Sequence, residues 1–233
     1  MYKRQVLVKS GPLTTTGASR LSAISALRSG AGAVTLSSDT NALVVNASHL
    51  TSVMLKEINN ADELSRFMKE KKIDTVIIGP GSGVNKLTKD MIIMAIKEEK
   101  SLVLDADGLT SFEKKPEELF FYLKNRKKRE NIILTPHHGE FNRLFKISNL
   151  NKIEKTNLAA NLTNSTILYK GNDTVISTPK KETLISQESS PFLATAGSGD
   201  VLAGICGSFL AQGMKSHQAA AAASWLHNEI GLE

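Results

Sequence analysis

Short apolar segments alternate with helix-like ones along most of this chain, and this alternation constrains the fold more than any other feature. The apolar segments predict buried strands at 6–8, 33–36, 75–78, 102–104, 132–134 and 166–169. Helical periodicity predicts helices over 18–30, 61–72, 89–99, 200–212 and about 217–229. Short buried strands separated by helices form a parallel sheet that helices cover on both faces. We therefore expect an α/β fold with a mainly parallel central sheet.

The segment 174–193 departs from this alternation. Two apolar pairs, at 175–176 and 184–185, are separated by turn residues. This pattern predicts an antiparallel hairpin at one edge of the sheet. The chain shows no internal repeat and no linker rich in glycine, serine or proline, so we expect one domain over residues 1–233.

Composition excludes several classes of protein. The chain has 233 residues, 41% of them hydrophobic, which is enough for one sizeable core. No apolar run approaches the roughly 20 residues of a membrane span, and the N-terminus lacks the layout of a signal peptide. The single cysteine, Cys206, excludes an intrachain disulfide and is typical of a reducing compartment. We expect a cytoplasmic protein without a membrane partner.

The net charge of +6 comes largely from basic runs at 69–72 and 124–129. Aromatic residues do not interleave with these runs, and both lie at expected helix ends. We interpret them as solvated helix ends, and we expect no nucleic-acid partner. A mild positive field still favours anionic small molecules.

Five polar or glycine-rich motifs are placed where ligands bind in open α/β sheets, beyond the carboxyl ends of the strands. Four follow predicted strands directly: GPGSG at 79–83, DADG at 105–108, TPHHGE at 135–140 and YKGND at 169–173. The fifth, TAGSGD at 195–200, precedes a predicted helix. Their convergence predicts a site for a phosphate-bearing small molecule.

The TAGSGD motif carries the clearest chemistry. A glycine-rich turn before a helix presents free N–H groups and the positive end of the helix dipole, and this arrangement binds anions. The charge of Asp200 would repel a phosphate, so the residue suits a catalytic base or a partner for a substrate hydroxyl. A plain helix cap is the alternative. The glycine spacing matches neither the dinucleotide fingerprint nor the Walker pattern.

The carboxylates of the other motifs allow more than one interpretation. Asp105 and Asp107 could hold Mg²⁺ through water, or Asp107 could cap the following helix. His137 and Glu140 could bind a substrate group or help to place a metal-bound phosphate. Lys170 could neutralise a nucleotide phosphate.

Taken in order, GPGSG, LDADGL, LTPHHGEFNRLF, LYKGNDTVI and ATAGSGDVLAGICG resemble the motifs of the ADP/ATP-dependent NAD(P)H-hydrate dehydratases. The segments 11–18 and 26–32 are also similar to the first loop and helix of that family. The resemblance covers nearly the whole chain and implies a ribokinase-like fold. It implies an enzyme that restores NADH or NADPH from the S-epimer of its hydrate, by phosphorylating the ring hydroxyl and eliminating phosphate.

The resemblance also implies roles for individual residues. Asp200 would contact the hydrated ring and act as the catalytic base. The turn Gly197, Ser198 and Gly199 would bind the transferring phosphoryl group and the nucleotide. Residues expected along the nucleotide are Lys170, Gly171, Asn172, Asp173 and Thr174, and those expected in the hydrated-dinucleotide pocket are Ala18, Gly81, Gly83 and His137.

The family implies further partners. These are Mg²⁺, ADP or ATP as co-substrate, a homotetrameric assembly, and an epimerase that is fused to the dehydratase or works with it. For the metal, Glu140 is a candidate that would act through water. Because the family usually continues through another helical segment, we expect the chain to be truncated at its C-terminus.

One departure and two alternatives remain. The first strand ends in Lys9-Ser10-Gly11 where the family usually has a Gly-Gly-Ser loop. A small-molecule kinase of the hydroxyethylthiazole or pyridoxal type would share the AGSGD turn and its aspartate. An inactive nucleotide-binding remnant is the third hypothesis, although the presence of Asp200, Lys170 and His137 argues against it.

Overall fold

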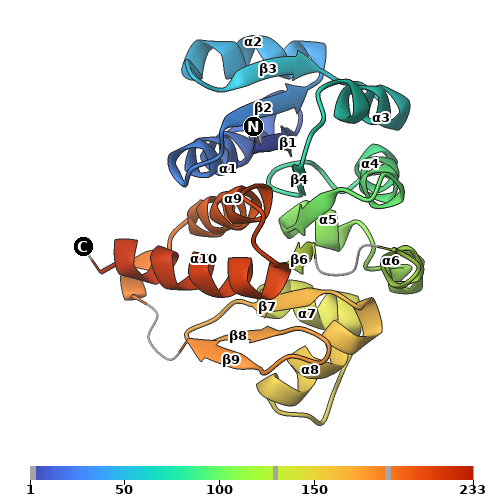
Figure 1. Ribbon diagram of the computed structural model, residues 1–233, viewed down its shortest axis with the longest axis vertical. Helices are drawn as coiled ribbons and strands as arrows, with labels where there is room; N and C mark the ends of the chain where they lie inside the picture. The colour runs from blue at the N-terminus through green and yellow to red at the C-terminus, as the bar shows by residue number, and fades with distance from the viewer. Residues whose placement is uncertain (1–3, 128–130, 187–189, 233) are drawn as a thin grey trace.

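The computed structural model describes residues 4–127, 131–186 and 190–232. The strands of the described residues form one sheet in the order β3-β2-β1-β4-β5-β6-β7-β8-β9 (Figure 1). Neighbours from β3 to β7 pair in parallel, whereas β8 is antiparallel to both β7 and β9. This confirms the expected mainly parallel sheet with an antiparallel hairpin at its edge. The strands are β1 (Gln5–Lys9), β2 (Ala33–Ser38), β3 (Met54–Glu57), β4 (Thr75–Ile78), β5 (Ser101–Leu104), β6 (Ile132–Leu134), β7 (Thr166–Tyr169), β8 (Thr174–Ser177) and β9 (Leu184–Ser186).

Helices cover both faces of this sheet. Figure 1 shows α1, α9 and α10 together on one side and α3 to α6 on the other. The helices are α1 (Thr16–Arg28), α2 (Thr40–His49), α3 (Ala61–Glu70), α4 (Lys86–Lys97), α5 (Ala106–Thr110), α6 (Pro116–Lys124), α7 (His138–Phe145), α8 (Lys152–Thr163), α9 (Ser198–Ala211) and α10 (Ser216–Ile230). Short 3-10 turns, η1 (Leu13–Thr15) and η2 (Pro191–Leu193), precede α1 and α9.

Each central strand contributes to two separate hydrophobic cores. In β4, Val76 and Ile78 pack into the core beneath α3 to α8, whereas Ile77 packs into the core beneath α1, α9 and α10. Because successive side chains of a strand point to opposite faces, a strand covered on both sides must be apolar at every position. This requirement is why the buried strands were visible as continuous apolar runs.

Several elements were not predicted or begin at other residues. The helix expected from residue 89 begins at Lys86, because Asn85 caps it by accepting the Thr88 N–H at 2.9 Å. The elements for which sequence analysis gave no range are α2, β3, α5, α6, α7 and α8. Both basic runs do lie at helix ends, since α3 ends at Glu70 and α6 at Lys124, although residues 128–129 of the second run lie outside the described residues.

Two expectations from composition can be compared with the fold. Cys206 is fully buried in the core beneath α9, and burial raises the pKa of its thiol to about 12. It is therefore a small core residue, as expected, and not a reactive thiol. Of the helices in the described ranges, none combines the length and the hydropathy that crossing a membrane requires.

Candidate active site

A largely buried ion pair marks the carboxyl edge of the sheet, where β5, β6 and β7 end side by side. Asp105 follows β5 and Lys170 follows β7, and the Lys170 Nζ lies 2.7 Å from the Asp105 Oδ1. The same oxygen accepts the Thr135 hydroxyl, which follows β6, at 2.8 Å. Asp105 is 1% exposed. Charges taken out of water at this depth are costly unless they are paired and hydrogen-bonded, and here the strand order supplies both partners.

The first turn of α9 lies against this ion pair. A Cβ atom on Gly199 would lie 3.2 Å from the Lys170 Nζ and 3.9 Å from the Asp105 Oδ2. The turn itself depends on Gly197, whose φ of +91° favours glycine and whose added Cβ would lie 2.5 Å from the Leu21 Cδ1. The N–H groups of a first helical turn have no partners within the helix. The Ser198 N–H donates to the Thr195 carbonyl at 3.3 Å, so the N–H groups of Gly199 and Asp200 are the ones that could bind an anion beside Lys170.

Asp200 is the third residue of α9 and is half-buried. Burial and the charges of Asp105 and Asp107 raise its pKa to about 6, although Lys170 acts in the opposite direction. The N-cap position belongs to Gly197, so the alternative that Asp200 is a plain helix cap is wrong. The Ser22 Oγ on α1 donates to the Asp200 carbonyl at 2.8 Å and fixes this residue against the first helix. A carboxylate that titrates near neutral pH is suited to general-base chemistry.

The charge on Lys170 is secured by its surroundings. Burial alone would lower the pKa of its ammonium group, but the carboxylates of Asp105, Glu140 and Asp200 together raise it. Lys170 thus stays a cation at the base of the site. This arrangement supports the predicted role in neutralising an anion.

His137 and Glu140 form a reciprocal cap at the start of α7. The His137 Nδ1 accepts the N–H groups of Gly139 and Glu140 at 2.9 and 3.3 Å, and the Glu140 Oε2 accepts the His137 N–H at 2.8 Å. The Glu140 Oε1 lies 3.2 Å from the His137 Nε2. Burial, together with Lys170 and Arg143, lowers the pKa of His137, which keeps its ring neutral. Burial and Asp105 raise the pKa of Glu140.

The GPGSG loop is held against the start of α1. The Thr15 Oγ1 donates to the Gly81 carbonyl at 2.8 Å, and a Cβ on Gly81 would lie 2.4 Å from the Thr15 carbonyl oxygen and 3.3 Å from the Ala18 Cβ. The Gly83 N–H donates to the Asp107 Oδ2 at 2.8 Å. The suggestion that Asp107 caps the following helix is wrong, because the N-cap of α5 is Asp105 and the Asp107 carboxylate binds this loop instead. Ala18 and Gly81 are neighbours, as a shared pocket requires.

A cleft of about 620 Å³ lies in front of the α9 turn. Among the predicted site residues, those that line it are His137, Lys170, Gly171, Asn172, Thr174, Ser198 and Gly199. The side chain of Asp173 instead pairs with the Lys152 Nζ, which lies 2.7 Å from its Oδ1. In the described residues, Ala18, Gly81, Gly83, Gly197 and Asp200 are not part of the lining.

Sequence reasoning missed several residues of this cleft. From α10, Ser224, His227 and Asn228 line its wall. His138 also lines the cleft, and its Nδ1 lies 2.8 Å from the Tyr169 hydroxyl. The α10 residues carry no local signal, because their part in the site depends on how α10 packs beside α9. His138 does carry a local signal, because it is the second histidine of the TPHHGE motif, which directly follows a predicted strand.

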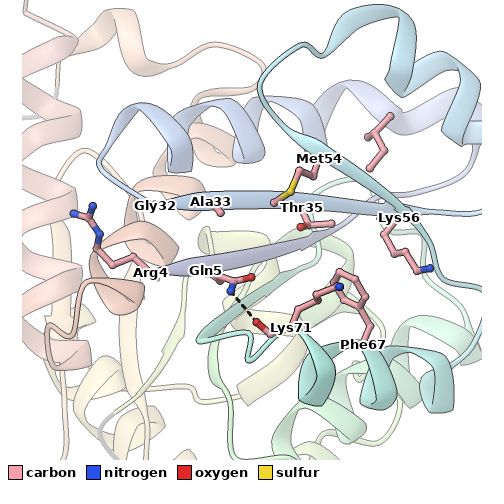
Figure 2. Close-up of a pocket in the computed structure, with 10 residues that line it drawn as sticks. Arg4, Gln5, Gly32, Ala33, Thr35, Met54, Lys56, Phe67 and Lys71 are labelled. Carbon is pink, nitrogen blue, oxygen red and sulfur yellow. Dashed lines mark hydrogen bonds between the residues drawn. The ribbon is translucent and has the colours of Figure 1, made fainter. Parts of the chain in front are cut away.

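A larger cavity of about 730 Å³ lies at the opposite, amino edge of the sheet (Figure 2). Its lining includes Gln5 at the start of β1, Ala33 at the start of β2 and Phe67 on α3. Figure 2 shows the charged ends of Arg4 and Lys56 on opposite sides of this groove. In the described part of the chain its lining includes none of the predicted site residues. The carboxyl edge is therefore the candidate active site, although it holds the smaller cavity.

The residues at the carboxyl edge do not form a complete metal cage. In the described ranges there is no group of three or more histidine, cysteine, aspartate or glutamate side chains placed to hold an ion. Mg²⁺ commonly keeps several waters and takes only one or two carboxylates, with substrate phosphates as its other ligands. A site with Asp105 beside an anion-binding turn fits that pattern and does not fit a metal held by protein alone.

Several known sequences are similar to this chain over most of its length. A family model described as NAD(P)H-hydrate dehydratase matches residues 6–233. The ADP-dependent (S)-NAD(P)H-hydrate dehydratase of Lactococcus lactis is 32% identical over 97% of this chain and 80% of its own length. The bifunctional NAD(P)H-hydrate repair enzyme Nnr of Coxiella burnetii is 30% identical over 96% of this chain. The chain spans only 44% of that relative's length.

Solved structures agree on the fold. A ribokinase-like superfamily protein from Enterococcus faecalis superposes with a TM-score of 0.82 at 24% identity, covering 99% of this chain and 80% of that one. The ADP/ATP-dependent NAD(P)H-hydrate dehydratase of Bacillus subtilis, co-crystallized with ATP/Mg²⁺, superposes with a TM-score of 0.79 at 24% identity. The match covers 97% of this chain and 78% of that one. The fold is thus ribokinase-like. Since the family model extends from the first strand to the end of the last helix, the chain belongs to the NAD(P)H-hydrate dehydratase family.

Proposed function

We propose that this chain uses ADP or ATP to dehydrate the S-epimer of hydrated NADH or NADPH. The observation that carries the proposal is the position of Asp200. Its carboxylate, with a pKa of about 6, lies on the first turn of α9, beside the Asp105–Lys170 ion pair. A base, an anion-binding turn and a buried cation are the three components that phosphoryl transfer to a hydroxyl requires.

The proposed reaction has two stages. Asp200 accepts the proton of the ring hydroxyl as its oxygen attacks the terminal phosphorus of the nucleotide, so that one P–O bond forms and the bond to the nucleotide leaving group breaks. The lone pair of the ring nitrogen then expels phosphate, and loss of a proton from the adjacent ring carbon restores the double bond. The products are NAD(P)H, inorganic phosphate and the shortened nucleotide. Positioning and charge neutralisation account for most of the catalysis in such a transfer.

The chain's own residues divide these tasks. The N–H groups of the Gly197–Gly199 turn would bind the phosphoryl group, and Lys170 would neutralise its charge. The segment 170–174 would follow the nucleotide along the cleft. The hydrated ring would lie on the side of Asp200 that faces α1, between Ala18, the loop at Gly81 and Gly83, and His137. The placement of the ring is supported by the proximity of Ala18 to Gly81, since a Cβ added to Gly81 would lie 3.3 Å from the Ala18 Cβ. The placement of the nucleotide is supported by the cleft lining.

Mg²⁺ would be held mainly by the nucleotide phosphates, and Asp105 is a carboxylate beside the α9 turn, with its Oδ2 3.9 Å from a Cβ placed on Gly199. Both Glu140 oxygens already bind His137, so any contribution from Glu140 would pass through water. When bound, the metal supplies further neutralisation of phosphate charge. The co-crystallization of the Bacillus subtilis protein with ATP/Mg²⁺ supports this part of the proposal.

The test is recovery of the reduced-nicotinamide absorbance band. Purified protein is mixed with hydrated NADH or NADPH, Mg²⁺, and either ADP or ATP. Recovery that requires nucleotide and releases free phosphate in equal amount supports the proposal. A stable phosphorylated product would instead indicate a small-molecule kinase. Nucleotide binding by folded protein without turnover would indicate an inactive remnant.

We also propose a homotetramer that works in the cytoplasm, either fused to an epimerase or beside one. The family resemblance supports the assembly, and the bifunctional relative supports the link to a second repair activity. Light scattering on purified protein would measure the assembly, and a mass of four chains is the expected result. Addition of an epimerase should allow the R-epimer of the hydrate to be consumed as well.

A further inference from the structure

One buried imidazole at the candidate site has no part in the reaction described above. His227 lies on α10, is 8% exposed and lines the cleft. Its Nε2 lies 3.0 Å from the Ser198 carbonyl oxygen and 3.1 Å from the Ser198 Oγ. Ser198 is the first residue of α9. A helix 29 residues further along the chain therefore contacts the anion-binding turn directly.

The two contacts together fix where the protons lie. A carbonyl oxygen only accepts hydrogen bonds, so the His227 Nε2 must carry a hydrogen to bind the Ser198 carbonyl. A nitrogen that carries a hydrogen cannot accept the Ser198 hydroxyl proton. At this nitrogen the hydroxyl oxygen can only accept, and its proton stays available for another acceptor. Burial lowers the pKa of His227, which keeps the ring in its neutral form near pH 7.

The acceptor follows from the position of the hydroxyl. Ser198 lines the cleft beside Gly199 and Lys170, where the first turn of α9 is open to an anion. An anionic oxygen is a strong acceptor for a hydroxyl. We propose that His227 is a positioning residue, which orients the Ser198 hydroxyl to donate to a phosphate oxygen of the bound nucleotide. This inference rests on the proposed function, because it assumes that the cleft binds a nucleotide.

The test compares nucleotide affinity in matched variants by titration calorimetry with ADP and Mg²⁺. His227→Leu removes the donor, whereas His227→Gln keeps an N–H group at nearly the same distance from the backbone. We expect His227→Leu and Ser198→Ala each to weaken ADP binding about tenfold, the size of one good hydrogen bond. His227→Gln should bind within about threefold of the unchanged protein. The double variant should be no weaker than Ser198→Ala alone, because both changes remove the same bond.

The control lies on the same helix. The His217 Nε2 lies 3.0 Å from the Glu182 carbonyl oxygen and belongs to no part of the cleft lining in the described residues. His217→Leu therefore removes an imidazole–carbonyl contact of the same kind, and ADP affinity should not change.

Two further readouts separate a positioning role from a structural one. The KM for the nucleotide should rise in His227→Leu while the KM for the hydrated dinucleotide stays the same. If His227→Leu fails to fold, Ser198→Ala still tests the proposal, since it leaves the helix contacts in place. Unchanged ADP affinity in Ser198→Ala, or an equal loss in His227→Gln and His227→Leu, would overturn the inference. Failure of the unchanged protein to bind ADP would instead overturn the proposed function.

Discussion

The two edges of the central sheet both carry cations and cavities, but their charged side chains differ in exposure to solvent. At the carboxyl edge, the side chains of Lys170 and Asp105 are 18% and 2% exposed and lie 2.7 Å apart. At the amino edge, Lys71 pairs with Glu70 at 2.8 Å, but these two side chains are 52% and 67% exposed. The amino edge holds the larger cavity, about 730 Å³ against about 620 Å³. The edge with the candidate site is therefore the one with the smaller cavity and the less exposed charges.

The burial of charge, and not the size of a cavity, is the difference between the edges that carries functional information. A protein that only needs stability rarely places a charged pair in its interior, because apolar side chains of the same volume do as well or better. Buried charge beside an open helix N-terminus indicates that the site is built for an anion. The exposed lysines of the amino edge are solvated, so they indicate no ligand.

The largest expected effect concerns the base. Asp200→Asn should lower kcat by about a thousandfold, the usual contribution of general-base catalysis. The ADP affinity should change little, because the amide keeps the volume of the side chain. Steady-state kinetics on purified variants would measure both. A variant with nearly full kcat would show that Asp200 is not the base.

The same variant should be more stable than the unchanged protein at neutral pH. The pKa of Asp200 is raised from 3.8 to about 6, so its ionisation costs stability that is lost as the pH rises from about 4 to about 6 and stays lost above it. The full shift corresponds to roughly 3 kcal/mol, and screening of a half-exposed group reduces this to about 1 kcal/mol. Urea unfolding at pH 7.5 and at pH 3.5 would show the gain at the higher pH only. An equal gain at both pH values would contradict this cause.

Removing the buried cation should have the next largest effect. Lys170→Met leaves Asp105 without its charged partner in the interior, and we expect a loss of about 3 kcal/mol in the free energy of unfolding. Lys71→Met at the amino edge is the matched control and should cost less than about 1 kcal/mol. Lys170→Met with Asp105→Asn should recover part of the loss, because no uncompensated charge remains. Equal losses of stability in Lys170→Met and Lys71→Met would show that the two ion pairs do not differ in the way that their exposure predicts.

The pH dependence of kcat/KM should also report the ionisation of Asp200. Asp200 must be ionised to accept a proton, so kcat/KM should fall about tenfold per pH unit below about pH 6 and level off above it. The residual activity of Asp200→Asn should lack this limb. Measurement between pH 5 and 8 on both proteins would decide whether the limb belongs to Asp200.

The smallest expected effect concerns the cap of α7. His137→Ala removes the acceptor of two backbone N–H groups and should cost about 1 kcal/mol of stability. His137→Asn should keep most of the stability, because asparagine is a good N-cap. A larger fall in hydrate affinity than in stability would assign His137 to the substrate pocket as well. Recovery of both stability and hydrate affinity in His137→Asn would show that the cap is the whole role of the residue.

The buried strands and the convergence of motifs were predictable because both depend on local rules. A strand covered on two faces is continuously apolar, as at Val76 and Ile77, and parallel strands place their carboxyl ends together. The partners within the site were not predictable. Asp105 and Lys170 follow strands that are separated by β6, so their pairing depends on strand order. His227 reaches the site only because α10 packs beside α9, and no local pattern encodes that contact.

Amide hydrogen exchange with and without ADP and Mg²⁺ tests the central claim most directly. The claim is that the carboxyl edge, and not the larger amino-edge cavity, binds the nucleotide. The account predicts slower exchange at residues 197–200 and 170–174 when ADP is bound, and unchanged exchange at residues 32–35 and 54–56. Protection confined to 32–35 and 54–56, with none at 197–200, would contradict the account.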